Sequence, residues 1–559
     1  MILRKFMRSG ILFFVAVILL LPALGKANVS LKNGNFFMAY TDIVYPGGFD
    51  PKIERVYNSK TSFKGIFGFG WGTEYEVKLT VSADGSIVVH EYGGGAENRF
   101  TAAFNAQELD KAVEMISDAA RKSGSIGSAG QLEEYKKKLK TNANYRNEQW
   151  EEFVERKKLE RRVLPNGAQL HSVRYTYQYI TKVAGGYVRT FDSGKIEKFN
   201  DAGKLVRISD KNNNFIELSY GKDGHLQKLV DNFNRKIFFV FNNQGLLEKL
   251  TGEGGKMATY GYNQIGQLTR SQDVDGNVYT YKYDKRHNMI EIGYQDKTTL
   301  AMTYYGPERH DNIKSVKDRD GTITEYGYDT DKSDPNHYSV SVKIKAPDGK
   351  QISKNSYEYF IKRKADGEEW TYKMITELDG DRTETVYNDA SLPVSIKHGA
   401  EETTFEYDNK GHVTKKVTAG EVTELSYDPK VSKVSKVVQY PKGNKKEATW
   451  SAFQYDEKGN LVFAKNSKNR GVKLLYDSNG RIKTLIDQNK RQINFKYNEN
   501  SKPVEISDPA LGTITVSYKN TGEINKVESK AGRKIALEVT AAFQNLLEII
   551  RPAGVNLSF

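Results

Sequence analysis

The chain has 559 residues, which is too long for one compact core and indicates several domains or a repeat array. It contains 48 Gly, 34 Tyr and 26 Phe, and its mean hydropathy is −0.63. This composition excludes an apolar helical bundle and favours a β protein rich in turns. Because the sequence has no cysteine, disulfide bonds, thiol nucleophiles and thiolate zinc sites are excluded as well.

The net charge of the chain is +14, and removal of residues 1–27 with their four basic residues leaves +10. A basic exported protein can meet acidic envelope polymers or DNA. The charges are dispersed along the chain, however, and the one basic run, at residues 156–162, has no interleaved aromatic residues. We therefore interpret it as a solvated helix end and expect no nucleic-acid partner.

The N-terminal segment has the order of a secretory signal peptide. Basic residues precede an apolar run over residues 11–21, and the small-residue pattern Gly25-Lys26-Ala27 follows. The run is too short to span a membrane comfortably, so we expect a signal peptide over residues 1–27 that is cleaved after Ala27. The alternative is an uncleaved anchor. With cleavage, the protein is secreted or periplasmic, or at the cell surface, and has no transmembrane segment.

An amphipathic segment precedes the part of the chain that looks like β structure. We expect residues 105–162 to form two helices, capped at the start by Asn105 and broken at residues 123–128, where Gly and Ser are frequent. The apolar positions at helical spacing are Leu109, Val113 and Ile116, then Leu132, Tyr135, Leu139, Trp150, Phe153 and Val154. The helices would cover sheet edges, plug an open end of the fold, or present a docking surface to a partner.

An aromatic residue then recurs every 21 residues in two stretches, which identifies an internal repeat. The aromatic positions are Phe199, Tyr220, Phe241, Tyr262, Tyr283 and Tyr304, and later Tyr455, Tyr476, Tyr497 and Tyr518. A Gly usually follows four residues after the aromatic, an apolar residue follows at six, and an Asp often follows at eleven. These positions predict alternating turns and strands.

The end of each unit alternates between apolar and polar residues, which indicates a strand with one buried face. We expect the residues at positions seventeen and nineteen to point inward, with four of them largely buried: Phe239, Tyr281, Leu474 and Val516. Each unit then consists of two short strands, and neighbouring units pair in one antiparallel sheet that twists and coils. Between Tyr304 and Tyr455 the period loosens, and we expect longer loops around residues 331–336 and 365–369.

The repeat resembles the YD repeat of the RHS family. An aromatic residue is followed by Asp or Asn and, four positions on, by Gly, as in Tyr476-Asp477-Ser478-Asn479-Gly480-Arg481-Ile482 and around Asn263-Gln264-Ile265-Gly266. Residues 29–47, 55–72 and 83–95 look like the leader domain that precedes the repeats in that family. The resemblance implies a β-shell, which is a spiralling sheet with a hollow interior. Large members continue into a variable toxin, whereas Asp508-Pro509 here falls at an ordinary turn position, so we expect no C-terminal toxin.

The expected fold class is therefore all-β, a coiled antiparallel sheet of 21-residue hairpins with a small two-helix insertion. The expected domains are the signal peptide at 1–27, the leader at 28–104, the helical insertion at 105–162, a first YD array at 163–330, irregular repeats at 331–450 and a second array at 451–559.

The search for chemistry predicts no catalytic, cofactor-binding or metal-binding residue. The histidines show no close pair with metal-ligand spacing; they are His90, His171, His225, His287, His310, His337, His398 and His412. The Gly-rich segments 65–72 and 91–95 lack the context of a phosphate loop and suggest packing. The Asp-Gly segments at 273–277, 318–321 and 379–381 faintly resemble calcium loops, but they fall where a hairpin must turn.

The predicted function is a non-enzymatic exported scaffold that binds an envelope component, either a carbohydrate or a protein, through its curved sheet. One alternative is a partial cage or carrier for a separately encoded toxin or effector. Another is an enzyme that acts on cell-wall polysaccharide, which would require converging carboxylates. No cofactor is expected, and the oligomeric state is left open.

Overall fold

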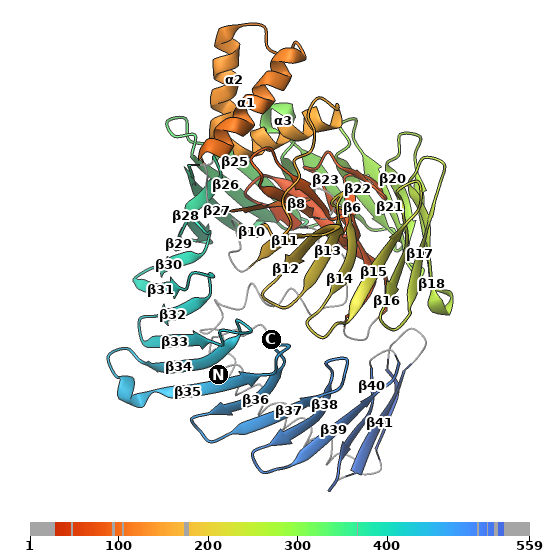
Figure 1. The fold of residues 1–559 in the computed structure, drawn as a ribbon, viewed down its shortest axis with the longest axis vertical. Coiled ribbons are helices and arrows are strands. Elements are labelled where there is room, and N and C mark those ends of the chain that lie inside the picture. Colours follow the sequence, from red (N-terminus) through yellow and green to blue (C-terminus); the bar gives the residue numbers. More distant parts are fainter. Residues whose placement is uncertain are drawn as a thin grey trace.

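The computed structural model describes residues 28–45, 49–91, 95–102, 106–172, 178–365, 367–499, 502–510, 512–518 and 524–529. The predicted signal peptide and Asn105 lie outside these residues. One long antiparallel sheet runs from β7 (Lys78–Val81) to β42 (Ile524–Ser529), and each strand in it pairs with the next one in sequence. The sheet coils through the whole molecule (Figure 1) and is not closed. The all-β fold class is confirmed.

The described leader strands contribute to three sheets. Strands β1 (Asn28–Ser30), β2 (Asn35–Val44), β3 (Lys52–Asn58) and β6 (Trp71–Thr73) form a separate four-stranded sheet, and β4 (Lys64–Gly65) pairs with β5 (Gly68–Phe69). The strands β7, β8 (Ile87–Glu91) and β9 (Ala96–Thr101) instead begin the long sheet. Alternate residues of β3 are buried, so this strand has one face in the core. Figure 1 shows the leader strands within the curve of the first array.

The first array consists of short strands. The first strand has four residues, and the others have five or six. They are β10 (Gln169–Ser172), β11 (Tyr179–Val183), β12 (Gly186–Thr190), β13 (Ile196–Asn200), β14 (Leu205–Ser209), β15 (Phe215–Tyr220), β16 (Leu226–Asp231), β17 (Lys236–Phe241), β18 (Leu247–Gly252), β19 (Met257–Tyr262), β20 (Leu268–Gln272), β21 (Val278–Tyr283), β22 (Met289–Tyr294), β23 (Thr299–Tyr304) and β24 (Ile313–Lys317).

The Asp or Asn that follows each aromatic residue shapes the next turn. In one unit, Asp477 Oδ1 accepts hydrogen bonds from the backbone N–H groups of Asn479 and Arg481, both at 3.0 Å. Gly480 follows with φ of 76°, a left-handed conformation that favours glycine. The aromatic, Asp/Asn and Gly pattern is therefore a device that turns the chain between two strands.

The predicted inward positions are confirmed in three of four cases. Phe239, Tyr281 and Leu474 are buried, with exposed fractions of 6%, 3% and 3%. The prediction for Val516 is wrong, because this side chain is only half-buried. Val516 lies in β41 (Gly512–Tyr518), which pairs with the last described strand, so fewer described strands surround it.

The irregular section differs from the prediction in part. Its strands lengthen, and a connection lies at residues 331–336 as predicted, but the second predicted loop stays short. Strand β27 has 13 residues and β28 has 10, yet the connection between them, residues 364–368, is as short as an ordinary repeat turn. The section contains β25 (Ile323–Thr330), β26 (His337–Lys345), β27 (Gln351–Arg363), β28 (Glu369–Leu378), β29 (Asp381–Tyr387), β30 (Pro393–His398), β31 (Glu401–Tyr407), β32 (Val413–Val417), β33 (Glu421–Tyr427) and β34 (Val434–Pro441). The predicted longer loop at 365–369 is therefore wrong.

The second array follows and repeats the short strands of the first. It contains β35 (Thr449–Tyr455), β36 (Leu461–Asn466), β37 (Gly471–Tyr476), β38 (Ile482–Asp487), β39 (Gln492–Tyr497), β40 (Pro503–Asp508), β41 and β42.

Turns of the second array contact a turn of the first. Lys211 Nζ donates to the carbonyl oxygen of Gly459 at 2.7 Å, and the side chain of Asn460 donates to Asn212 Oδ1 at 2.9 Å. Asn214 Nδ2 donates to the carbonyl oxygen of Asn479 at 3.0 Å. About 250 residues separate the partners of these bonds, so the coiled sheet returns to its own rim, as Figure 1 shows.

The helical insertion contains three helices, so the prediction of two is wrong. They are α1 (Ala106–Lys122), α2 (Ala129–Thr141) and α3 (Ala143–Glu155). The predicted second helix breaks at Asn142, whose side chain accepts a hydrogen bond from the backbone N–H of Tyr145 and caps α3. No described helix is long and apolar enough to cross a membrane.

The expected apolar stripes of the helices are buried, but mainly against one another. Leu109, Val113, Ile116, Trp150 and Phe153 share one cluster, and its only buried member outside the helices is Ala83. Polar contacts among the described residues also join the helices to the sheet and its turns. The indole N–H of Trp150 donates to the carbonyl oxygen of Val81 at 3.0 Å. The backbone N–H of Ala143 donates to the carbonyl oxygen of Gly367 at 3.5 Å, in the turn between β27 and β28.

The repeat tyrosines also tie neighbouring strands together. In each of nine units, the hydroxyl at the end of one strand donates to the backbone carbonyl of the first residue of the preceding strand. The pairs are Tyr220 and Leu205, Tyr262 and Leu247, Tyr304 and Met289, Tyr407 and Pro393, Tyr427 and Val413, Tyr455 and Val434, Tyr476 and Leu461, Tyr497 and Ile482, and Tyr518 and Pro503. Burial raises the pKa of Tyr476 to about 12, so the hydroxyl stays a neutral donor near pH 7.

Replacing one of these tyrosines tests their structural role. We expect Tyr476→Phe to lower the free energy of unfolding by about 0.5 to 1.5 kcal/mol, because the carbonyl of Leu461 loses a buried donor. Urea unfolding monitored by circular dichroism measures the change. The control is Tyr440→Phe, since the hydroxyl of Tyr440 bonds to Glu424 at the surface. Equal losses in both variants would contradict a special role for the repeat hydroxyl.

Candidate binding site between the leader and the helices

The sequence motifs considered as possible sites have structural roles. Within the described residues, no group of three or more His, Asp or Glu side chains is placed to hold a metal ion. In the segment 273–277, Asp273 Oδ1 accepts the backbone N–H groups of Asp275 and Asn277, and its Oδ2 accepts the side chain of Asn277. The carboxylate of this faint calcium motif is thus engaged in closing a turn.

The Gly-rich segment 65–72 packs in the core. Phe67 and Trp71 are fully buried, and a Cβ on Gly68 would lie 2.5 Å from the carbonyl oxygen of Gly266 in the repeat sheet. Glu76, just after the segment, accepts backbone hydrogen bonds from Ile66 and Thr73, and burial raises its pKa to about 8. The glycines therefore allow the close approach of leader and repeats, as the packing interpretation predicted.

Another polar group lies across three adjacent strands near α3. The hydroxyl of Thr80 lies 3.1 Å from His90 Nε2, and His90 Nδ1 lies 3.0 Å from a carboxylate oxygen of Glu97. This order resembles a nucleophile, base and acid, but Thr80 is only 4% exposed. The three side chains line a small cavity of about 160 Å³ beside α3.

A cavity of about 390 Å³ lies between the leader, the helices and the start of the first array. We call it the arginine pocket, because three guanidinium groups, from Arg99, Arg146 and Arg162, line it together with the carboxylates of Asp84 and Glu108. The other lining residues are Gly85, Thr101, Ala102, Leu109, Leu164, Ala168, Gln169 and Leu170. Cavities with convergent polar groups are the usual places for ligands.

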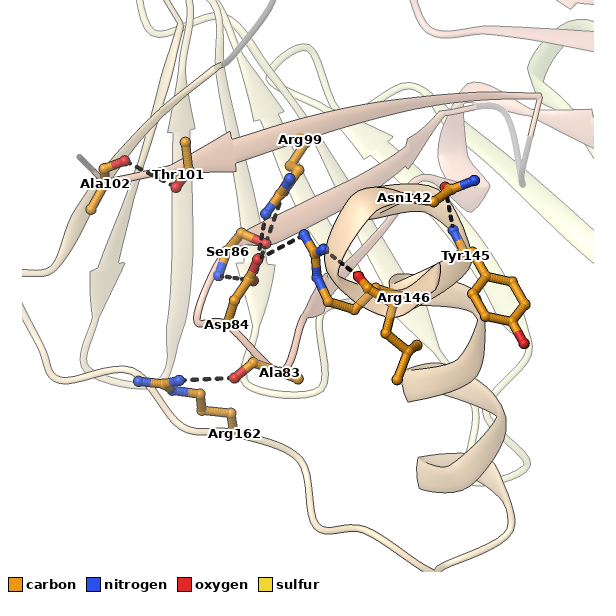
Figure 2. A network of polar contacts seen from close by, with 11 residues as sticks. Ala83, Asp84, Ser86, Arg99, Thr101, Ala102, Asn142, Tyr145, Arg146 and Arg162 are labelled. Carbon is orange, nitrogen blue, oxygen red and sulfur yellow. Dashed lines mark hydrogen bonds and ion pairs between the residues drawn. The ribbon is translucent and has the colours of Figure 1, made fainter. Parts of the chain in front are cut away.

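Asp84 organises the inner part of the arginine pocket. It lies in the turn between β7 and β8, where its Oδ1 accepts the backbone N–H of Ser86 at 3.0 Å and its hydroxyl at 2.6 Å. Arg99, from β9, pairs with Asp84 Oδ2, and Arg146, from α3, approaches the same oxygen at 3.5 Å (Figure 2). One carboxylate thus holds guanidinium groups from a strand and a helix.

Two further hydrogen bonds fix the positions of these arginines. Arg146 Nη1 donates to the carbonyl oxygen of Leu139 at 2.8 Å, and Arg99 Nε donates to the hydroxyl of Ser86 at 3.2 Å. The side chains of Arg146 and Asp84 are 1% and 9% exposed. The inner wall is therefore a preorganised, largely buried array of charges.

Arg162 forms the outer wall. Its Nη1 donates to the carbonyl oxygen of Ala83 at 2.9 Å, and its Nη2 lies 2.7 Å from a carboxylate oxygen of Glu108. Its side chain is 35% exposed, so it borders the opening of the pocket. The sequence predicted a solvated helix end here, whereas α3 ends at Glu155 and Arg162 turns back onto the leader.

The arginines of the pocket keep Asp84 ionised. Burial by itself raises the pKa of Asp84, but Arg99, Ser86 and Arg146 outweigh this effect and hold the pKa of the carboxyl below its ordinary value. Asp84 therefore stays ionised at neutral pH. The described lining thus carries three guanidinium groups and two carboxylates.

The sequence contains no signal that would have identified this pocket. Its charged residues are spread from Asp84 to Arg162, with no regular spacing, and each has a common alternative interpretation as a turn or surface residue. Only the packing of α1 and α3 on the hairpin formed by β7 and β8 brings them together.

Three family models match the sequence. A domain of unknown function (DUF6531) matches residues 26–100, the RHS repeat matches residues 262–299, and the teneurin YD-shell matches residues 449–559. A search of curated proteins finds no match.

Solved structures of Tc toxins are similar over most of this chain, at low identity. TcdB2-TccC3 has 11% identity and a TM-score of 0.38, with 89% of this chain and 30% of that chain covered. TcdB2-TccC3-TEV has 12% identity and a TM-score of 0.34, with 93% and 29% covered. The Photorhabdus luminescens Tc holotoxin pore has 11% identity and a TM-score of 0.36, with 89% and 29% covered.

This chain thus spans less than a third of the length of those toxin chains. The three family models correspond to the leader and to parts of both arrays, in the order that the sequence predicted. Residues 262–299 thus match the RHS repeat and residues 449–559 match the teneurin YD-shell, which agrees with the resemblance to YD repeats that the sequence predicted.

Proposed function

We propose that this protein is an exported, non-enzymatic YD-repeat scaffold that binds an envelope component, either a carbohydrate or a protein, in the arginine pocket. The observation that carries the proposal is the cavity of about 390 Å³ whose buried charges come from the leader and the helical insertion. The long sheet serves as the support that holds these two parts in fixed positions.

The structural roles of the repeat residues support a scaffold without catalysis. The tyrosine hydroxyls donate to backbone carbonyls, and the Asp and Asn residues that follow the aromatics close turns. Side chains committed to the fold in this way are poor candidates for chemistry on a substrate. The proposal includes export through the predicted signal peptide, with Asn28 as the first residue of the mature chain.

Blocking the pocket tests the proposal. Gln169 is an exposed strand residue that lines the opening, so Gln169→Trp should fill the cavity without disturbing the core. We expect the mature protein to retain an envelope glycan or protein from an extract, and Gln169→Trp to lose it. The matched control is Gln227→Trp, an exposed strand residue remote from the pocket. Retention by all three proteins would contradict binding in the pocket, and retention by none would contradict the proposed function.

A second candidate is a cage or carrier for a separately encoded effector. It is favoured by the return of the second array onto the first, where Lys211 contacts Gly459, because this contact lets one chain curve into a wall. The similar structures are complexes of Tc toxin components. Co-purification of a neighbouring effector with the mature protein, unaffected by Gln169→Trp, would favour this candidate over the first.

A further inference from the structure

We propose that the two arrays meet at a latch that opens and closes while the rest of the protein stays folded. The latch consists of the turn at residues 210–214 of the first array and the turns at 456–460 and 477–481 of the second array. Opening of the latch gives a partner access to the space between the two arrays.

The turn of the first array fits between the two turns of the second array. Asn212 Oδ1 accepts a hydrogen bond from the side chain of Asn460 at 2.9 Å, while Lys211 and Asn214 donate to backbone carbonyl oxygens of the second array. A Cβ on Gly480 would lie 2.1 Å from the side chain of Asn212. Asn460 and Asn214 are only 4% and 9% exposed. The closed latch is therefore a closely fitted contact.

The described contacts of the latch are polar, so they hold it weakly. Each hydrogen bond that breaks on opening is replaced by one to water, and its net contribution is small. The buried apolar residues of the two arrays belong to separate core clusters. Burial, followed by the nearby charge of Lys433, lowers the pKa of Lys211, so closure is unfavourable for this ammonium group. Contacts of this kind open more readily than a packed core.

The part of the sheet between the two arrays can bend. Strands β30, β31 and β32 lie in this part of the chain (Figure 1), and every residue in these three strands is at least partly exposed. A bend here disrupts few buried apolar contacts, because these strands have no fully buried side chain. Small rotations between successive strands add up along a sheet. The latch can therefore open without disruption of either core cluster.

A single introduced thiol tests the opening, because the chain has no cysteine of its own. In the mature protein, we expect Asn460→Cys to react with iodoacetamide at least about 10-fold faster than Asn288→Cys, since local opening requires less free energy than global unfolding. Dilute urea should leave the faster rate unchanged, because local opening exposes little surface. Mass spectrometry measures both rates, and equal thermal unfolding of the two variants verifies that they fold.

Asn288 is the matched control for this labelling experiment. Asn288 and Asn460 each follow the repeat aromatic by five residues, and each is 4% exposed. Asn288 lies beside the leader, however, where the backbone N–H of Met289 donates to the hydroxyl of Tyr57.

A second substitution tests the fit of the latch. Added to Asn460→Cys, Gly480→Ala should raise the labelling rate about fivefold or more, because its Cβ collides with the side chain of Asn212 in the closed state. The control is Gly224→Ala, which has a similar positive φ and a Cβ that meets only the flexible end of Lys204, at 3.2 Å. This control should leave the rate unchanged.

Hydrogen exchange of the unsubstituted protein gives an independent measurement, because Asn460→Cys itself removes one bond of the latch. The three turns of the latch should exchange together and before the buried strands of either array. Exchange in these turns as slow as in the buried strands would overturn the proposal. So would equal labelling of Asn460→Cys and Asn288→Cys with the same urea dependence, or equal effects of Gly480→Ala and Gly224→Ala.

Discussion

Replacing Arg55 by alanine is expected to lower the free energy of unfolding by about 3 to 5 kcal/mol, the loss typical when one partner of a buried ion pair is removed. Arg55, in β3 of the leader, is fully buried, and its Nε donates to Asp42 Oδ2 at 2.8 Å. Its other nitrogens donate to the hydroxyls of Tyr281 and Ser271, at 2.9 and 2.8 Å.

The expected loss is large because Arg55 connects two parts of the fold. Asp42 and Arg55 belong to the leader sheet, whereas Ser271 and Tyr281 belong to the first array. The guanidinium also lies over the rings of Tyr40 and Trp71, at 4.6 and 4.9 Å from their centroids. Without it, the carboxylate of Asp42 stays buried with only the hydroxyl of Tyr260 as a partner among these side chains.

Denaturant unfolding followed by circular dichroism and by tryptophan fluorescence measures this change. The matched control is Arg207→Ala, which breaks a surface ion pair with Glu217 in the repeat sheet and should change stability by about 1 kcal/mol or less. If both variants lost the same free energy, the cluster around Arg55 would not join leader and repeats in the way the structure indicates.

Replacing Leu474 by alanine is expected to cost about 2 to 5 kcal/mol, the range for removing a large buried aliphatic side chain. Leu474 is 3% exposed and lies opposite the fully buried Leu485 in the neighbouring strand. Both belong to the core cluster of the second array, which is separate from that of the first array and the leader. The cavity left by the substitution would therefore weaken a small core with few other contributors.

The adjacent residue provides the control for this experiment. Leu475 points to the other face of β37 and is 41% exposed, so Leu475→Ala should change stability by no more than about 0.5 kcal/mol. Urea unfolding of both variants compares the two faces of one strand directly. A larger loss in Leu475→Ala than in Leu474→Ala would mean that the register of the repeat is shifted by one residue.

The repeat could be predicted from the sequence because the physical rules behind it are local. Successive side chains of a strand point to opposite faces, so every second residue faces the core, as Phe239 and Leu474 show. The Asp or Asn and the Gly after each aromatic residue determine the turns. The same reasoning was wrong at β27 and β28, since residues that continue a strand and residues of a polar loop look alike when both faces are partly exposed. It also missed the helix break at Asn142, where a single capping side chain decides the outcome.

The sequence by itself therefore determined the all-β class, the strand and turn positions of the regular units and the buried stripes of the helices. Only the tertiary structure decided how far the sheet coils, so that Lys211 meets Gly459, because curvature accumulates from small rotations between many strands. The tertiary structure also creates the arginine pocket, where Asp84, Arg146 and Arg162 converge from a turn, a helix and a connecting segment. Such convergence depends on contacts between distant segments, and no local pattern of residues encodes it.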